Sequence, residues 1–153
     1  MIRVLYVFLC VLLVGCQSNI DKSTNKTNPL NDQALDKLVC NNIANVDDDD
    51  FIEFFKFSVQ MENKGMNQLS KDKQIKVFTI MSKALKGDNQ IVKINKNQAY
   101  ADLFTLKSKF GEKLFIPDEK GMDIILKNLP KHRAANLLRF MLKLGCKSSK
   151  TYK

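Results

Sequence analysis

Hydrophobic and polar residues follow a helical period over most of the chain. Between residues 51 and 64 the polar positions recur every three or four residues and leave one narrow polar stripe, which predicts the most buried helix. Residues 70–86 carry a broad apolar face, and Ser70 is the expected N-cap of that helix. Residues 130–145 carry a well-defined apolar stripe, and Gly145 is the expected end of that last helix.

The period changes between residues 90 and 117. Short apolar runs at 90–94 and 99–106 flank an asparagine-rich turn, and a third run follows at 114–116, which predicts a small antiparallel β-meander. A competing interpretation keeps residues 96–110 helical, with one face formed by Tyr100, Leu103, Phe104 and Leu106.

These patterns predict an α+β fold. We expect a mostly helical single domain of about five helices, the first beginning near residue 31, with the β-meander packed against them. Residues 122–129 form either a short helix or a last strand. The alternative fold class is an all-α bundle.

The first sixteen residues predict an export signal. Arg3 supplies a positive charge, residues 4–14 form an unbroken apolar run, and a glycine and a cysteine follow. About eleven apolar residues make roughly 16 Å of helix, too short to span the ~30 Å hydrocarbon core of a bilayer. An uncleaved membrane helix, or an ordinary signal peptide with a chance cysteine, is the alternative interpretation.

The tetrapeptide Leu13-Val14-Gly15-Cys16 resembles the lipobox of bacterial lipoprotein precursors. The resemblance implies that the chain is cleaved before Cys16, that Cys16 is acylated, and that the acyl chains hold the protein on a membrane. Gln17, rather than aspartate, stands second in the mature chain, which by the same resemblance favours the periplasmic face of the outer membrane. The inner membrane, or the single membrane of a Gram-positive cell, is the alternative.

The chain therefore divides into four parts. Residues 1–15 are the signal peptide, 16–30 a lipidated flexible tether, 31–146 the globular domain and 147–153 a basic tail. The tether is rich in Ser, Thr and Asn and has too little apolar surface to offset its ordering entropy. Loss of Arg3 with the signal peptide lowers the formal net charge from +9 to +8.

Cys40 and Cys146 are the two cysteines left for the domain. Cys10 leaves with the signal peptide, and the lipobox resemblance assigns Cys16 to lipid. In an oxidising compartment two remaining cysteines normally form a disulfide, so we expect the pair to be linked; two free thiols are the alternative. A redox-active pair is disfavoured because the chain has no Cys-x-x-Cys spacing.

Catalytic and metal chemistry has little support in the sequence. Four aspartates at 47–50 precede a helix, where carboxylates are stabilised by the free N–H groups, so we expect capping rather than calcium binding. His132 is the single histidine and lies between two basic residues, which predicts a surface position. No nucleophile elbow and no glycine-rich phosphate loop is present. We therefore expect no enzyme activity, no metal and no cofactor.

The excess of basic over acidic residues predicts an anionic partner. Lysine greatly outnumbers arginine, and lysine suits base or phosphate recognition less well than arginine, so nucleic acid is not the expected partner. We expect a lipid-anchored binding protein that captures an acidic protein, for instance as an inhibitor or immunity protein against an envelope-targeting toxin. A structural envelope lipoprotein that contacts peptidoglycan, lipopolysaccharide or an assembly machine is the alternative. The expected binding surface is the polar side of the last helix, formed by Lys131, Arg133, Arg139 and Lys143.

Overall fold

The computed structural model describes residues 38–64, 68–87, 90–114 and 118–148, and every regular element within them is helical. The elements are η1 (Leu38–Asn42), η2 (Ile43–Asn45), α3 (Asp48–Lys64), α4 (Lys71–Lys86), α5 (Lys96–Phe110), η4 (Gly111–Lys113), α6 (Glu119–Asn128) and α7 (Lys131–Ser148). None of the described helices is both long enough and apolar enough to span a bilayer.

The expected α+β class is wrong, because the described residues contain no strand. The segment expected to form the main strands is helix α5, so the competing helical interpretation of residues 96–110 and the all-α fold class fit the structure. Residues 90–94 are extended but pair with no strand, and α6 is a helix rather than a strand. Most of the third expected strand, at 115–117, lies outside the described residues.

Helix α5 was misjudged because apolar residues lie on both of its faces. Ala99 and Leu106 are buried against the protein, whereas Tyr100 and Phe104 are exposed on the other side. This arrangement blurs the 3.6-residue period and imitates the alternation of a strand. The helix begins at a genuine cap, since the Asn95 side chain accepts a hydrogen bond from the backbone N–H of Gln98 at 3.1 Å.

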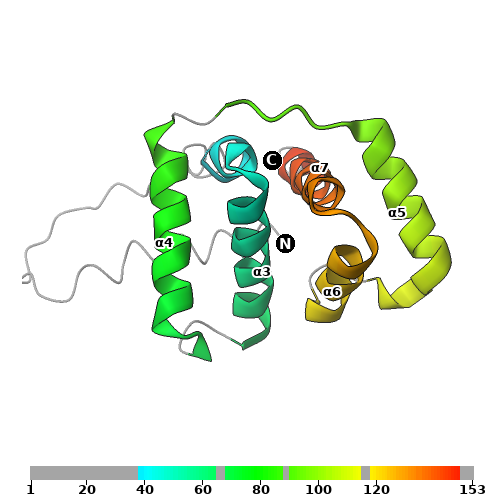
Figure 1. Cartoon of the computed structure of the whole chain (residues 1–153), viewed down its shortest axis with the longest axis horizontal. Coiled ribbons are helices and arrows are strands. Elements are labelled where there is room, and N and C mark those ends of the chain that lie inside the picture. The colour runs from blue at the N-terminus through cyan, green and yellow to red at the C-terminus, as the bar shows by residue number, and fades with distance from the viewer. Residues whose placement is uncertain (1–37, 65–67, 88–89, 115–117, 149–153) are drawn as a thin grey trace, which may run out of the picture.

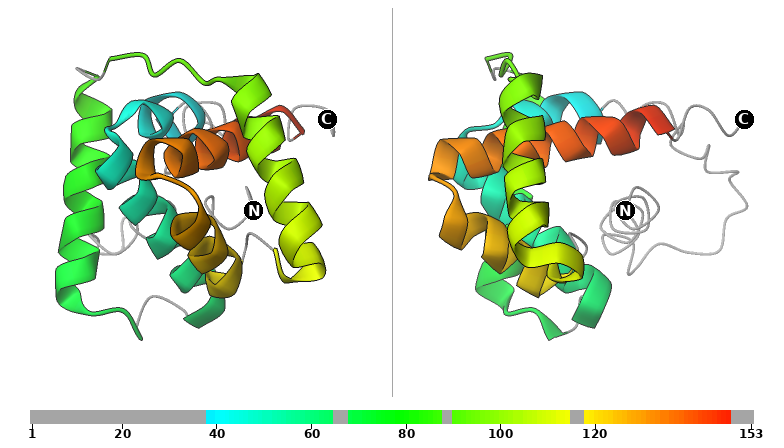
Figure 2. Two further views of the ribbon diagram at one scale, coloured as in Figure 1. Left: turned by 45° about the vertical axis from the view of Figure 1, so that its right-hand side comes forward. Right: turned by 90° about the vertical axis from the view of Figure 1, so that its right-hand side faces the viewer.

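The helices are arranged around α3 (Figure 1). Helix α4 packs along one side of α3, and α7 packs along another side and carries α5 on its far flank. Helix α6 packs against α3, α5 and α7. The second view of Figure 2 shows α7 crossing behind α5, so among the described elements α5 lies at the edge, with no other helix against one of its long sides.

The core lies around α3, between α4 on one side and α6 and α7 on the other. Fully buried side chains come from each of them and include Phe51, Phe54, Ile80, Ile125, Leu137 and Leu138. Burying a side chain of this size contributes roughly 1.5–3 kcal/mol relative to leaving it in water. The segment expected to be the most buried helix is α3, and its phenylalanines do form the centre of this core.

The predicted disulfide is confirmed: Cys40 and Cys146 are bonded, with their Cα atoms 6.0 Å apart. The bond joins η1 to the C-terminal part of α7 across a sequence separation of 106 residues. The expected helix end at Gly145 is wrong, because α7 continues to Ser148. Cys146 is buried and tied to η1, so its packing holds the helical turn that contains the glycine.

Candidate functional site

The four basic residues expected to bind a partner all lie on α7, but each of them is bonded to another part of the chain. Arg139 is the clearest correction, since only 2% of its surface is exposed. It was expected on the polar side of an amphipathic helix. Instead, α7 passes over the start of α3, and the arginine points into the junction.

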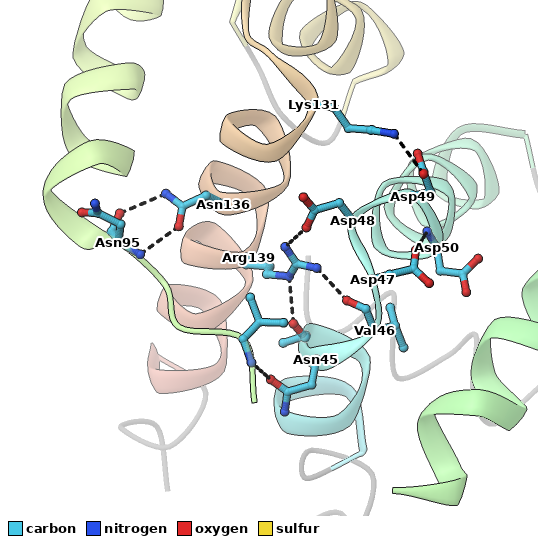
Figure 3. Close-up of polar contacts among 12 residues, drawn as sticks. Asn45, Val46, Asp47, Asp48, Asp49, Asp50, Asn95, Lys131, Asn136 and Arg139 are labelled. Carbon is cyan, nitrogen blue, oxygen red and sulfur yellow. Dashed lines mark hydrogen bonds and ion pairs between the residues drawn. The ribbon is translucent and has the colours of Figure 1, made fainter. Parts of the chain in front are cut away.

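Arg139 holds the chain that leads into α3 (Figure 3). Its guanidinium donates to the carbonyl oxygens of Ala44 and Val46, at 2.8 and 2.7 Å, and to a carboxylate oxygen of Asp48 at 2.5 Å. The guanidinium carbon lies 4.7 Å from the centre of the Phe51 ring. A buried guanidinium needs such a set of acceptors to offset its desolvation, so Arg139 is a structural residue.

Arg133 is paired in the same way with α5. Asp102 is 1% exposed, and its carboxylate accepts hydrogen bonds from the Nε of Arg133 at 3.2 Å, from an Nη of the same residue, and from Gln98 at 2.9 Å. The hydrogen bond to Asp102 raises the pKa of the Arg133 guanidinium above its usual range. Lys131 forms an exposed ion pair with Asp49 at 3.0 Å (Figure 3).

The four aspartates lie at the start of α3, and the expected capping role is confirmed for Asp47. Asp47 accepts a hydrogen bond from the backbone N–H of Asp50 at 2.9 Å, and this bond lowers the pKa of Asp47 below the usual carboxyl range. The next three aspartates pair with Arg139, Lys131 and Lys83, in that order. The described residues contain no cluster of side chains that could hold a metal ion, and His132 is exposed as expected.

The open side of α5 differs from the basic side of α7, because it carries exposed aromatic side chains and lysines without acidic partners among the described residues. A stripe at helical spacing runs along it, and we call this stripe the α5 face: Lys96, Tyr100, Leu103, Phe104 and Lys107. Phe104 is 76% exposed and Tyr100 57% exposed, although both are large aromatic side chains. Within the described part of the chain, neither lysine of the α5 face has an acidic partner.

A hollow of about 590 Å³ lies beside the α5 face. Its walls come from η1, η2, the extended segment 91–94, the start of α5 and the end of α7, and its apolar lining includes Ala44, Ile91, Val92, Ile94, Tyr100, Phe140 and Leu144. Lys96 and Lys143 are its charged lining residues, and no acidic side chain lines it. A second, more open depression of about 410 Å³ follows along α5 and shares Tyr100 with the first.

Side-chain amides fix the geometry of the hollow. Asn136 of α7 and the backbone of Asn95 exchange two hydrogen bonds, at 2.8 and 2.9 Å, which set the start of α5 on α7 (Figure 3). The Asn45 side chain accepts from the backbone N–H of Val92 at 3.0 Å and so ties the extended segment to η2. The rings of Tyr100 and Phe140 meet edge to face, with 4.7 Å between their centres.

Sequence reasoning did not identify the α5 face or the hollow. A signal was present, because the helical interpretation of 96–110 already grouped Tyr100, Leu103 and Phe104 on one face. It wrongly added Leu106, which is 3% exposed and faces the core. Cys16, the expected lipidation site, lies outside the described residues.

Comparison of the chain with known protein families, with curated proteins and with solved structures finds no match.

Proposed function

We propose that this protein is a lipid-anchored binding protein that captures an acidic protein partner in the periplasm, and that the α5 face is its binding surface. The observation that carries the proposal is the combination of two exposed aromatic rings with two lysines that have no acidic partner among the described residues. Aromatic anchors with a charged rim are typical of protein interfaces, in which a few buried aromatic residues provide most of the binding energy.

Three of the four α7 cations expected to bind a partner are less suited to this role. Arg139 and Arg133 already donate to carboxylates within the fold, and Lys131 is held by Asp49. A partner would have to displace these bonds before it could use the same charges. Lys96 and Lys107 need no such exchange, so they can attract an acidic surface directly.

The proposed anchor is the acylated Cys16, connected to the domain by the tether at 16–30. From its sequence, a tether of about fourteen residues is expected to reach roughly 20 Å, which is enough to hold the domain clear of the lipid head groups. A toxin that attacks the envelope is one partner that such a position suits. Intact mass measurement of the membrane fraction should show loss of residues 1–15 and a gain of acyl mass. Equal membrane retention of a Cys16→Ser variant would contradict the anchor.

Charge reversal on α5 tests the proposed binding surface. The double variant Lys96→Glu/Lys107→Glu should lose the partner that the unaltered protein co-purifies from the periplasmic fraction, and association should slow more than dissociation speeds up. The matched control is Lys71→Glu/Lys86→Glu, which makes the same change in net charge at two exposed lysines of α4. Equal loss in both double variants would contradict a localised surface and indicate attraction by net charge alone. Retention of the partner by the α5 variant would also contradict the proposal.

A further inference from the structure

The hollow between η1, the segment 91–94, α5 and α7 has the dimensions of a ligand site. Sites for small molecules in proteins typically measure about 300–1,000 Å³ and are lined by apolar side chains with a few polar groups. This hollow measures about 590 Å³ and has predominantly apolar walls. Ile91 is 88% exposed and Leu144 45% exposed, so its apolar rim is open to solvent in the free protein.

Lys143 has an unusual position at this hollow. Its side chain is half-buried, and its Nζ donates to the side-chain oxygen of Asn41 at 3.1 Å. Burial lowers the pKa of the Lys143 ammonium below its ordinary range. The other basic residues singled out on α7 each have a carboxylate partner, whereas no described carboxylate pairs with Lys143. A partly desolvated ammonium without a counter-ion favours the binding of an anion.

Both asparagine side chains of the lining already take part in hydrogen bonds within the protein. The side-chain oxygen of Asn41 accepts from Lys143, and that of Asn45 accepts from the backbone N–H of Val92. The side-chain nitrogen of Asn45 donates to the backbone oxygen of Asn41 at 2.7 Å. A hydrocarbon chain has no N–H or C=O groups that would need partners against the apolar walls of this hollow.

We infer that the hollow binds an anionic amphiphile, a molecule with one carboxylate or phosphate head and a hydrocarbon chain. Lys143 and Lys96 hold the head, and the chain lies against Ile94, Phe140 and Leu144. Each methylene buried there contributes roughly 0.8 kcal/mol, so the affinity rises with chain length. This site adjoins the proposed protein-binding surface and shares Lys96 and Tyr100 with it, whereas Lys143 and Leu144 belong to the hollow alone.

Photoaffinity labelling of the full chain in isolated membranes tests the inference. The probe is a photoactivatable twelve-carbon carboxylate, and its control is the primary alcohol of the same length. We expect the carboxylate to label about ten times more strongly, the factor that corresponds to 1.4 kcal/mol. The labelled peptides should contain Tyr100 or Leu144. Unlabelled dodecanoate should compete for the site, whereas hexanoate should compete weakly.

Three variants test which lysine binds the carboxylate head of the probe. Lys143→Met should remove most of the excess labelling by the carboxylate over the alcohol, since only Lys96 is then left to hold the head, and Lys143→Arg should retain it. Lys107→Met removes a lysine from the α5 face outside the hollow and should leave labelling unchanged. Formation of the Cys40–Cys146 disulfide in each variant checks that the domain has folded. Equal labelling by carboxylate and alcohol, or equal loss in Lys143→Met and Lys107→Met, would overturn the inference.

A second probe distinguishes the two sources of such a ligand. A photoactivatable phosphatidylglycerol, delivered in phosphatidylcholine vesicles, presents the same chemistry from a bilayer. If labelling depends on Lys143 with the free carboxylate probe but not with the phosphatidylglycerol probe, the ligand is a soluble amphiphile. The same dependence with the phosphatidylglycerol probe assigns a membrane lipid. If neither probe labels the protein more strongly than the alcohol control, the proposed ligand site is wrong. The proposed capture of a protein is tested independently, because it is supported if Lys143→Met still retains the protein partner.

Discussion

Helices α5 and α7 pack against each other, yet they use their positive charges in opposite ways. On α7 the charges face inward or across to neighbouring elements: Arg139 is bonded to the start of α3, and Arg133 to Asp102 of α5. On α5 the lysines of the α5 face project from the open side, beside two exposed aromatic rings. Arg133 and Arg139 of α7 therefore stabilise the fold, whereas Lys96 and Lys107 of α5 remain available for recognition.

This difference between α5 and α7 shows that a stripe of basic residues in a sequence is not enough to identify a binding surface. The chain has 25 basic and 16 acidic residues, and the positions of the carboxylates decide which cations stay free. Three consecutive aspartates at the start of α3 each pair with a cation from elsewhere in the chain, two of them from α7. No described carboxylate lies within ion-pair distance of the α5 lysines.

The largest expected effect concerns the bond that fixes the C-terminal part of α7. The double variant Cys40→Ser/Cys146→Ser should lower the free energy of unfolding by about 2–5 kcal/mol, because the bond closes a very long loop in the unfolded chain. Urea denaturation of the oxidised protein and the variant measures the change. Cys16→Ser is the matched control, since it removes a cysteine that takes no part in this bond. Equal stability of the double variant and the control would contradict a native disulfide.

Loss of the Arg139 guanidinium should be nearly as damaging. Arg139→Met keeps the aliphatic part but leaves the carbonyl oxygens of Ala44 and Val46 without their donor, which should cost about 2–4 kcal/mol in the free energy of unfolding. Lys107→Met on α5 removes a charge with no described partner and should change stability by less than about 0.5 kcal/mol. Equal losses in the free energy of unfolding for the two substitutions would contradict the view that Arg139 of α7 stabilises the fold and Lys107 of α5 does not.

The sequence was sufficient to predict a feature where a residue type has a single structural role in its local context. The disulfide was predicted from the number of cysteines and the expected export of the chain. The caps at Asp47 and Ser70 were predicted from the free N–H groups of helix N-termini, and Ser70 accepts from the backbone N–H of Lys73 at 3.4 Å. It was insufficient for α5, because burial of one face and exposure of the other are set by α7. The position of Arg139 likewise depends on a contact 91 residues away in sequence, with Asp48.

A smaller effect is expected at the cap of α3. Asp47→Ala should lower stability by about 1 kcal/mol at neutral pH, whereas Asp47→Asn keeps an oxygen that can cap and should cost less. Because the pKa of Asp47 is lowered in the folded state, its stabilising charge is fully present above the ordinary carboxyl pKa and is lost as the pH falls through the lowered value. The difference between the unaltered protein and Asp47→Asn should therefore vanish in acid. A difference that persists or grows there would contradict this account of the cap.

The central claim is that α5, rather than the basic side of α7, meets the partner. Site-specific cross-linking in cells tests it most directly, with a photoreactive phenylalanine analogue at position 104 on α5 or at position 132 on α7. Phe104 and His132 are both exposed, so neither replacement disturbs the core. We predict a discrete cross-linked product from position 104 and none from position 132. A product from position 132 alone, or equal products from both positions, would contradict the claim.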